Sequence, residues 1–95
     1  MSAITPVEAT SGWARPVTVR FDGGSITIQR GLLGRNETRI PISRVTAVNF
    51  RRGLTGRGYI EFLGVGEDAR VDFAIWKASQ FEALAASVSA ALAGP

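Results

Sequence analysis

Apolar and polar residues alternate with a period of two over much of the chain from residue 17 onward. Val17, Val19 and Phe21 alternate with polar side chains, and Ile26 and Ile28 do so again after the sequence Asp-Gly-Gly-Ser. This period places every second side chain on one face of a β-strand, and aspartate followed by glycine favours a tight turn. The pattern predicts an antiparallel hairpin that begins a series of strands.

Four further segments are predicted to be extended. The first, residues 38–40, ends at Pro41, which removes a backbone donor and so indicates a strand that is short or lies at a sheet edge. A turn near Ser43 and Arg44 precedes a strand that ends at Phe50, and strands follow at residues 59–62 and 71–75. The chain therefore contains six strand candidates in sequence.

The period changes to that of an α-helix after residue 76. Apolar residues then recur at the spacing of one helix face, at Phe81, Leu84, Ala85, Val88 and Leu92. The sequence Ser79-Gln80-Phe81-Glu82 has the form of a capping box, which predicts that the helix begins there. A single helix with one apolar stripe is expected to cover the open end of a bent sheet.

Two groups of small or apolar residues are candidates for an interface. Leu32 and Leu33 lie between glycines in an expected loop, where apolar side chains either fold back on the core or mark an interface. Ala83, Ala86 and Ala90 lie on the side of the helix opposite the apolar stripe, where small residues allow another surface to approach closely. Alanine is also the best helix former, so propensity alone is a second explanation of this face.

Length and composition indicate one compact domain. Residues 17–95 are long enough for a single core, whereas residues 1–16 have no hydrophobic period and are predicted to form a loosely ordered N-terminal arm. The 95 residues contain no cysteine, no signal-peptide pattern and no apolar run long enough to cross a membrane, which together favour a cytoplasmic protein.

The same composition argues against catalysis. Histidine and cysteine are both absent, and with them the usual general base, metal ligand and thiol nucleophile. Glu67, Asp68 and Asp72 are the acidic candidates for a calcium site, but their spacing matches no EF-hand loop, and carboxylates at a strand turn are usually solvated. The sequence predicts a protein that is not an enzyme and holds no metal or cofactor.

Charge divides the chain into two parts. Nine arginines face two carboxylates between residues 15 and 57, whereas two basic residues face five carboxylates from residue 58 onward. The segment from Arg51 to Gly58 combines arginines with glycines, a composition suited to carboxylates or phosphates and common also in solvated hairpin turns. The candidate contact residues for a ligand or partner are Arg35, Arg51, Arg52, Leu54 and Arg57.

In their order along the chain, these segments resemble a bacterial pleckstrin-homology-like domain. The resemblance is carried by several short motifs, which are Phe21-Asp22-Gly23, Ile40-Pro41-Ile42 with Val45 and Val48, Gly58-Tyr59-Ile60-Glu61-Phe62, Val71-Asp72-Phe73, and Phe81 with Leu84. It is closest to an actinobacterial group of unknown function with the same Ile-Pro-Ile and Gly-Tyr-Ile-x-Phe patterns. The resemblance implies a mainly β fold, in which a bent antiparallel sheet or partly open barrel of six to seven strands is capped by a C-terminal helix.

The resemblance implies no particular chemistry. The lipid site of eukaryotic relatives needs basic residues around the first hairpin loop, whereas here the first predicted loop is the acidic Asp22-Gly23-Gly24. The sequence favours a non-catalytic interaction module that contacts a protein partner, or a second copy of itself, through the apolar loops and the basic loop. The alternative is an anionic membrane surface or phosphate-bearing ligand bound by Arg35, Arg51, Arg52 and Arg57. Nucleic acid is less favoured, because Tyr59 is the only nearby ring able to stack on a base.

Overall fold

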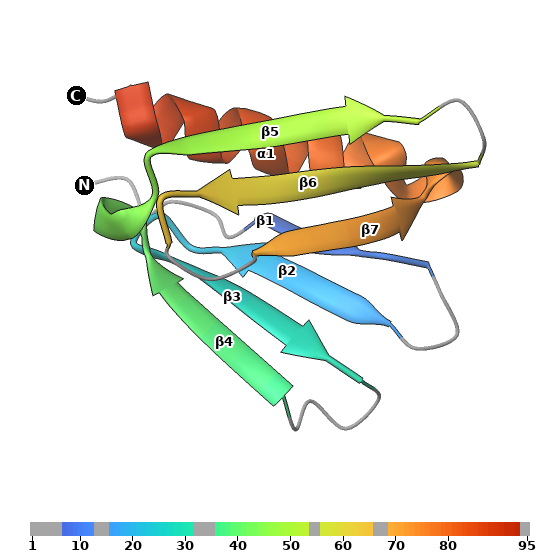
Figure 1. The fold of residues 1–95 in the computed structure, drawn as a ribbon, viewed down its shortest axis with the longest axis horizontal. Coiled ribbons are helices and arrows are strands. Elements are labelled where there is room, and N and C mark those ends of the chain that lie inside the picture. Colours follow the sequence, from blue (N-terminus) through green and yellow to red (C-terminus); the bar gives the residue numbers. More distant parts are fainter. Residues whose placement is uncertain (1–6, 13–15, 32–35, 54–55, 66–68, 94–95) are drawn as a thin grey trace.

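The computed structural model describes residues 7–12, 16–31, 36–53, 56–65 and 69–93. These residues form seven strands in two antiparallel sheets and one C-terminal helix (Figure 1). The first sheet has the order β1 (Val7–Thr10), β2 (Val17–Phe21), β3 (Ser25–Arg30) and β4 (Asn36–Pro41), and the second the order β5 (Ala47–Arg52), β6 (Arg57–Leu63) and β7 (Arg70–Ala74). The helix is α1 (Ala78–Ala93), and short 3₁₀ turns, η1 (Ile42–Arg44) and η2 (Ile75–Lys77), precede β5 and α1.

This architecture confirms the predicted fold class. The fold is mainly β with a C-terminal helix cap, as expected of a pleckstrin-homology-like domain. Within the described residues the two sheets stay separate, so no closed barrel forms. The six predicted strands are all present.

The seventh strand, β1, lies in the segment that the sequence analysis placed in a loose arm. Val7–Thr10 pairs with β2, and Ala9 is buried opposite Val19. The arm was predicted because residues 1–16 show no hydrophobic period, and the structure buries only one of the four side chains of β1. The prediction is wrong for these residues, and Trp13 of the same segment lies outside the described residues.

The hairpin of β2 and β3 forms as its alternation predicted. Val19 lies opposite Ile28 and Phe21 opposite Ile26, with all four side chains buried. The connecting turn is held by Asp22, whose Oδ1 accepts hydrogen bonds from the backbone N–H groups of Gly24 (2.9 Å) and Ser25 (2.8 Å). An aspartate that bonds its own turn in this way fixes the hairpin register.

The Asp22 turn gives a prediction about pH. The hydrogen bonds from the Gly24 and Ser25 N–H groups, together with nearby Arg39, hold the pKa of the Asp22 carboxyl below its ordinary value. Because the folded-state pKa is lowered, the stabilisation is complete above the unfolded pKa of about 4 and is lost as pH falls through the folded value. We expect Asp22→Asn to lose stability at pH 7 and to unfold with a shallower acid dependence below pH ~4.

Urea denaturation of both proteins between pH 7 and pH 2 measures this difference, with Asp72→Asn as a carboxylate control outside the turn. Parallel pH profiles for wild type and Asp22→Asn would contradict the prediction.

The second sheet contributes most of the aromatic core. Phe73 of β7 stacks between Phe81 of α1, at a centroid distance of 4.4 Å, and Phe50 of β5, at 5.7 Å. Ile60 and Phe62 of β6 are also buried, facing the same interior. This cluster joins the second sheet to the helix.

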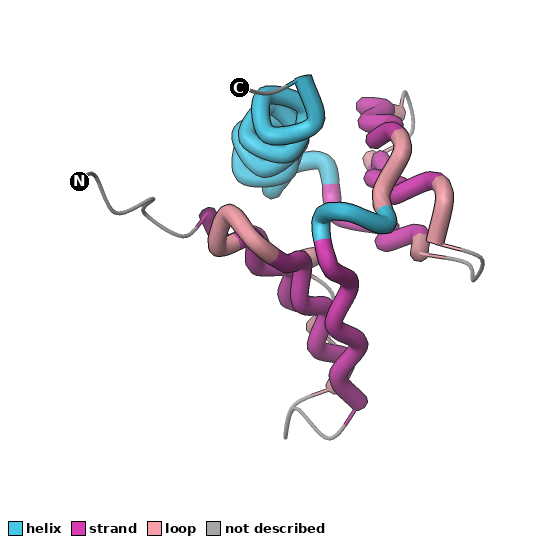
Figure 2. Tube along the Cα trace, turned by 90° about the vertical axis from the view of Figure 1, so that its left-hand side faces the viewer, coloured by secondary structure: helices cyan, strands magenta, loops and turns pink. Residues whose placement is uncertain are grey.

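The helix lies across the opening between the two sheets (Figure 2). It packs mainly against β1 of the first sheet and β5 of the second. The predicted start of the helix was wrong, because Ala78 already belongs to α1 and places Ser79 inside its first turn. Glu82, the expected partner in a capping box, instead forms an ion pair with Arg52.

Candidate functional site

Two of the predicted contact residues, Arg51 and Arg57, lie on the outer face of the second sheet. Side chains alternate between the faces of a strand, and Phe50 points inward to stack on Phe73, so Arg51 points outward. Arg51 lies opposite Tyr59 of β6, which in turn lies opposite Asp72 of β7. This register brings side chains from all three strands together on one face.

Two depressions adjoin these side chains, and the larger one also takes residues from the first sheet. A depression of about 330 Å³ is lined by Val17, Arg30, Arg57, Arg70 and Asp72. A second depression, of about 140 Å³, is lined by Arg51, Gly53, Arg57, Gly58, Tyr59, Arg70 and Asp72. The two share three lining residues, and we call the combined feature, with its four arginines 30, 51, 57 and 70, the arginine groove.

Positive charge dominates the arginine groove. Arg70 is held in place, with its Nε 3.2 Å from Asp72 Oδ1 and its Cζ 4.0 Å from the centroid of the Tyr59 ring. Arg30, Arg51 and Arg57 form no ion pair with any residue that the structure describes. The groove therefore presents three uncompensated guanidinium groups beside one that is already paired, an arrangement that favours an anionic ligand.

The sequence matches the family model for the bacterial PH domain over residues 4–92. The chain belongs to the bacterial PH domain family. No curated protein matches the chain at a significant level. PH-like domains are generally non-catalytic and commonly serve as interaction modules.

The other predicted contact residues of this bacterial PH domain lie elsewhere. Arg52 follows Arg51 in β5 and so faces the opposite side, where its Nη2 is 3.2 Å from Glu82 Oε2. Both side chains are largely exposed, and a surface pair of this kind contributes less than about 1 kcal/mol. Arg35 and Leu54 lie outside the described residues. The structure thus brings Arg51 and Arg57 together and separates Arg52 from them.

The expected basic loop is shorter than predicted. Arg51 and Arg52 belong to β5, and Arg57 and Gly58 belong to β6, so the connection is residues 53–56. Gly58 lines the smaller depression but is itself buried, because it lies against the ring of Phe73.

The candidate apolar interface is described only in part. Ala83, Ala86 and Ala90 are exposed on the outer side of α1, whereas Leu32 and Leu33 lie outside the described residues. The nearby Trp76 is the large hydrophobic residue that is most exposed in the described chain, at 67%. Helix propensity explains the alanines as well as an interface does.

The sequence analysis missed Arg30 and Arg70 as site residues. Arg30 ends β3 and Arg70 begins β7, and neither stands near the basic segment in the sequence. The packing of the two sheets brings Arg30 to Arg57, whereas Arg70 approaches Arg57 through the pairing of β6 with β7. A signal existed for Arg70 alone, because the alternation that buries Val71 and Phe73 turns Arg70 and Asp72 outward.

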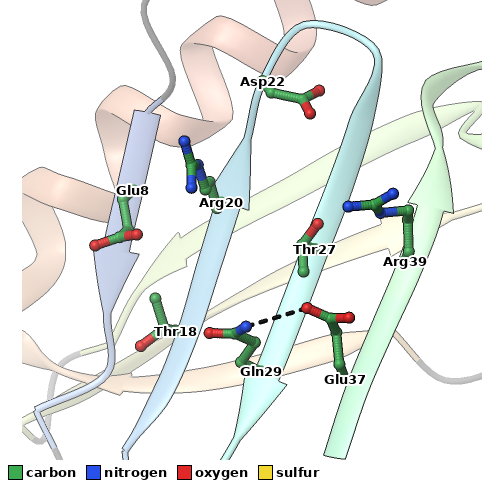
Figure 3. Close-up of a pocket in the computed structure, with 8 residues that line it drawn as sticks. All are labelled: Glu8, Thr18, Arg20, Asp22, Thr27, Gln29, Glu37 and Arg39. Atoms are coloured by element: carbon green, nitrogen blue, oxygen red, sulfur yellow. Dashed lines mark hydrogen bonds between the residues drawn. The ribbon is translucent and has the colours of Figure 1, made fainter. Parts of the chain in front are cut away.

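The outer face of the first sheet carries a different kind of hollow. A depression there has a volume of about 260 Å³. Its lining residues, drawn in Figure 3, are Glu8, Thr18, Arg20, Asp22, Thr27, Gln29, Glu37 and Arg39. Two arginines stand here among three carboxylates, so the charge is mixed. This mixture of charges does not favour an anionic ligand.

The remaining predictions concern acidic residues and membranes. Glu67 and Asp68 of the calcium alternative lie outside the described residues, and Asp72 pairs with Arg70. Among the residues that are described, no group of three acidic, histidine or cysteine side chains is placed to hold a metal ion. Within the same ranges, no helix is both long and apolar enough to span a membrane.

The β1 strand also changes how the Asp22 turn compares with relatives. The first hairpin of the bacterial PH domain is β1–β2, so the acidic Asp22 turn belongs to the second. The Asp22 turn is therefore the wrong loop to compare with the lipid site of eukaryotic relatives. The loop that corresponds by order contains residues 13–15, which lie outside the described ranges.

Proposed function

We propose that this bacterial PH domain is a non-catalytic interaction module that binds an acidic segment of a protein partner in the arginine groove. The observation that carries the proposal is the group of three arginines, Arg30, Arg51 and Arg57, that have no carboxylate partner among the described residues. Each guanidinium fork can hold a carboxylate with two parallel hydrogen bonds. An acidic segment therefore supplies the charge that the groove lacks.

The composition of the groove wall favours a peptide over a phosphate group. Asp72 stands among the arginines and repels a ligand that offers only acceptor oxygens. An extended peptide offers backbone N–H donors as well as carboxylates, and its apolar atoms can contact Val17 and the ring of Tyr59. The mixed wall therefore suits a peptide in which carboxylates, N–H donors and apolar groups follow one another.

The alternatives derived from the sequence rest on other residues. Self-association through apolar loops depends on Leu32, Leu33 and Leu54, which lie outside the described residues. Membrane binding would use Arg51 and Arg57 on a flat anionic surface, whereas these arginines line a hollow. The cytoplasmic location and the narrower actinobacterial grouping stay predictions.

A labelled peptide of alternating glutamate and serine tests the proposal by fluorescence anisotropy. We expect saturable binding that weakens with salt, and a loss of tenfold or more, equivalent to about 1.4 kcal/mol, in Arg51→Gln/Arg57→Gln. The matched control is Arg44→Gln/Arg52→Gln, which removes the same charge from exposed positions outside the groove and is expected to bind within about twofold of wild type.

Two results would overturn this function. Equal loss of peptide affinity in both double variants would mean that net charge, and not the groove, attracts the peptide. Flotation with phosphatidylglycerol vesicles that requires Arg51 and Arg57, in the absence of peptide binding, would replace the protein partner by a membrane surface.

A further inference from the structure

The edge strand β4 is left uncovered by the other helices and strands that the structure describes. The helix α1 packs along β1 and β5, which are the edges of the two sheets on the side of the helix. In contrast, β4 packs mainly against its neighbour β3 and stands at the far edge of the first sheet (Figures 1 and 2). Of its six residues only Ile40 is buried. Exposed edges of this kind are templates for a further strand.

The register shows which backbone groups of β4 are available. Ile42 N–H donates to Gly24 C=O at 3.0 Å, and the same register pairs Ile40 with Ile26 and Thr38 with Ile28. Bonded residues alternate along an antiparallel strand, so the N–H and C=O groups of Glu37 and Arg39 point away from β3. Pro41, which has no N–H, falls on this outward side, as a proline in a sheet must.

We propose that β4 pairs with β4 of a second copy of this chain, antiparallel, with Thr38 on the two-fold axis. In this register Glu37 of each copy lies opposite Arg39 of the other. The outward backbone groups of these residues then form four hydrogen bonds across the edge. The two four-stranded sheets join into one continuous sheet.

Charge selects this register over its neighbours. The Glu37 and Arg39 side chains lie on the same outer face of the sheet (Figure 3). With Thr38 on the axis, two pairs of opposite charge face each other across the strands, and Thr38 faces its own copy, a favourable cross-strand pair. Sliding one strand by two residues is the smallest shift that keeps these backbone groups paired. It places Glu37 opposite Glu37 or Arg39 opposite Arg39, which is unfavourable.

The same charges argue for a second copy and against an unrelated strand. Charged residues and proline on an edge normally prevent pairing, because a foreign strand leaves the charges unopposed. The sequence Glu-Thr-Arg complements itself when it is reversed, so a second copy removes this obstacle. Neither Glu37 nor Arg39 forms an ion pair with the residues that the structure describes, and Glu37 accepts only a hydrogen bond from Gln29 Nε2, at 3.1 Å.

Sedimentation equilibrium of the full chain tests the pairing. We expect wild type to dimerise reversibly, and Glu37→Arg and Arg39→Glu each to weaken the dimer by tenfold or more, because each places like charges in both cross-strand positions. The double variant Glu37→Arg/Arg39→Glu restores opposite charges and is expected to dimerise as wild type does. An equimolar mixture of the two single variants is expected to form a heterodimer.

The matched control is Arg20→Glu, on the same outer face and in the same cross-strand row as Arg39 but on the interior strand β2. It is expected to leave the dimer unchanged. Arg51→Gln/Arg57→Gln is also expected to dimerise normally, so the pairing and the peptide site can fail separately.

Three results would overturn the pairing. The first is a wild-type chain that stays monomeric at concentrations up to about 1 mM, since the dissociation constant would then be too large for a specific dimer. The second is a dimer that Arg39→Glu weakens no more than Arg20→Glu does, or that the double reversal fails to restore. The third is a dimer lost in Ala86→Glu but retained in Arg39→Glu, which would place the contact on the outer side of α1.

Discussion

Replacing Phe73 by alanine is expected to destabilise the domain by about 3 to 5 kcal/mol. The ring is fully buried and stacks on both Phe81 and Phe50, so the substitution removes contacts that join β7 to α1 and to β5. Domains of this size have a total free energy of unfolding of only about 5 to 15 kcal/mol. A fall in thermal midpoint of roughly 15 to 30 °C follows for a chain of this length.

Urea and thermal denaturation followed by circular dichroism measure this loss, and two variants separate its causes. Phe73→Leu keeps most of the buried volume and is expected to lose less than half as much stability. Trp76→Ala removes a larger ring from a position that is 67% exposed and is expected to cost less than about 1 kcal/mol. Similar losses for Phe73→Ala and Trp76→Ala would refute the assignment of Phe73 to the centre of the core.

Replacing Gly58 by alanine is expected to cost about 3 kcal/mol, for a steric reason. A Cβ at this position would lie 2.5 Å from the carbonyl oxygen of Arg51 and 2.7 Å from a ring atom of Phe73. The first neighbour is backbone and the second a fully buried ring, so neither can move without disturbing the β5–β6 ladder or the aromatic stack. The backbone at Gly58 does not have a positive φ, so close packing is the cause.

Gly24→Ala provides the control for Gly58→Ala. Gly24 also lacks a positive φ, and a Cβ there would meet only Asp22 Oδ1, at an ordinary contact distance of 3.7 Å. We expect this variant to be neutral or to gain up to about 1 kcal/mol by restricting the unfolded chain. Denaturation curves for Gly58→Ala that overlay those of Gly24→Ala would mean that β6 accommodates a methyl group.

Much of the fold follows from local pattern. The alternation of Val17, Val19 and Phe21 predicted the buried face of β2, and Pro41 indicated that β4 is short or lies at a sheet edge, where the structure places it. Strand β1 could not be found in this way, because only Ala9 of its four residues is buried. Its place depends on tertiary contacts, including the bond from Ala74 N–H to Ser11 C=O at 2.7 Å.

Only those features of the site that follow from the alternation of side chains along a strand could be predicted from the sequence. Arg51 and Arg52 are adjacent in the sequence, and their separation to opposite faces follows once β5 is known to continue through both. The predicted loop grouped Arg51 and Arg52 together, although their side chains have different surroundings. Arg52 pairs with Glu82, whereas Arg51 lines the groove. The approach of Arg30 to Arg57 depends on how the two sheets pack, which no local pattern records, whereas that of Arg70 follows from the pairing of β6 with β7.

The contact between β1 and α1 also bears on how the domain folds. Thr10 N–H donates to the Gln80 side chain at 3.2 Å across a sequence separation of 70 residues, and Ser11 bonds to β7 in the same corner. Contacts this distant form slowly, because a long loop must close before they contribute. During synthesis the first sheet therefore cannot bury all of its apolar face until the helix α1 has emerged from the ribosome.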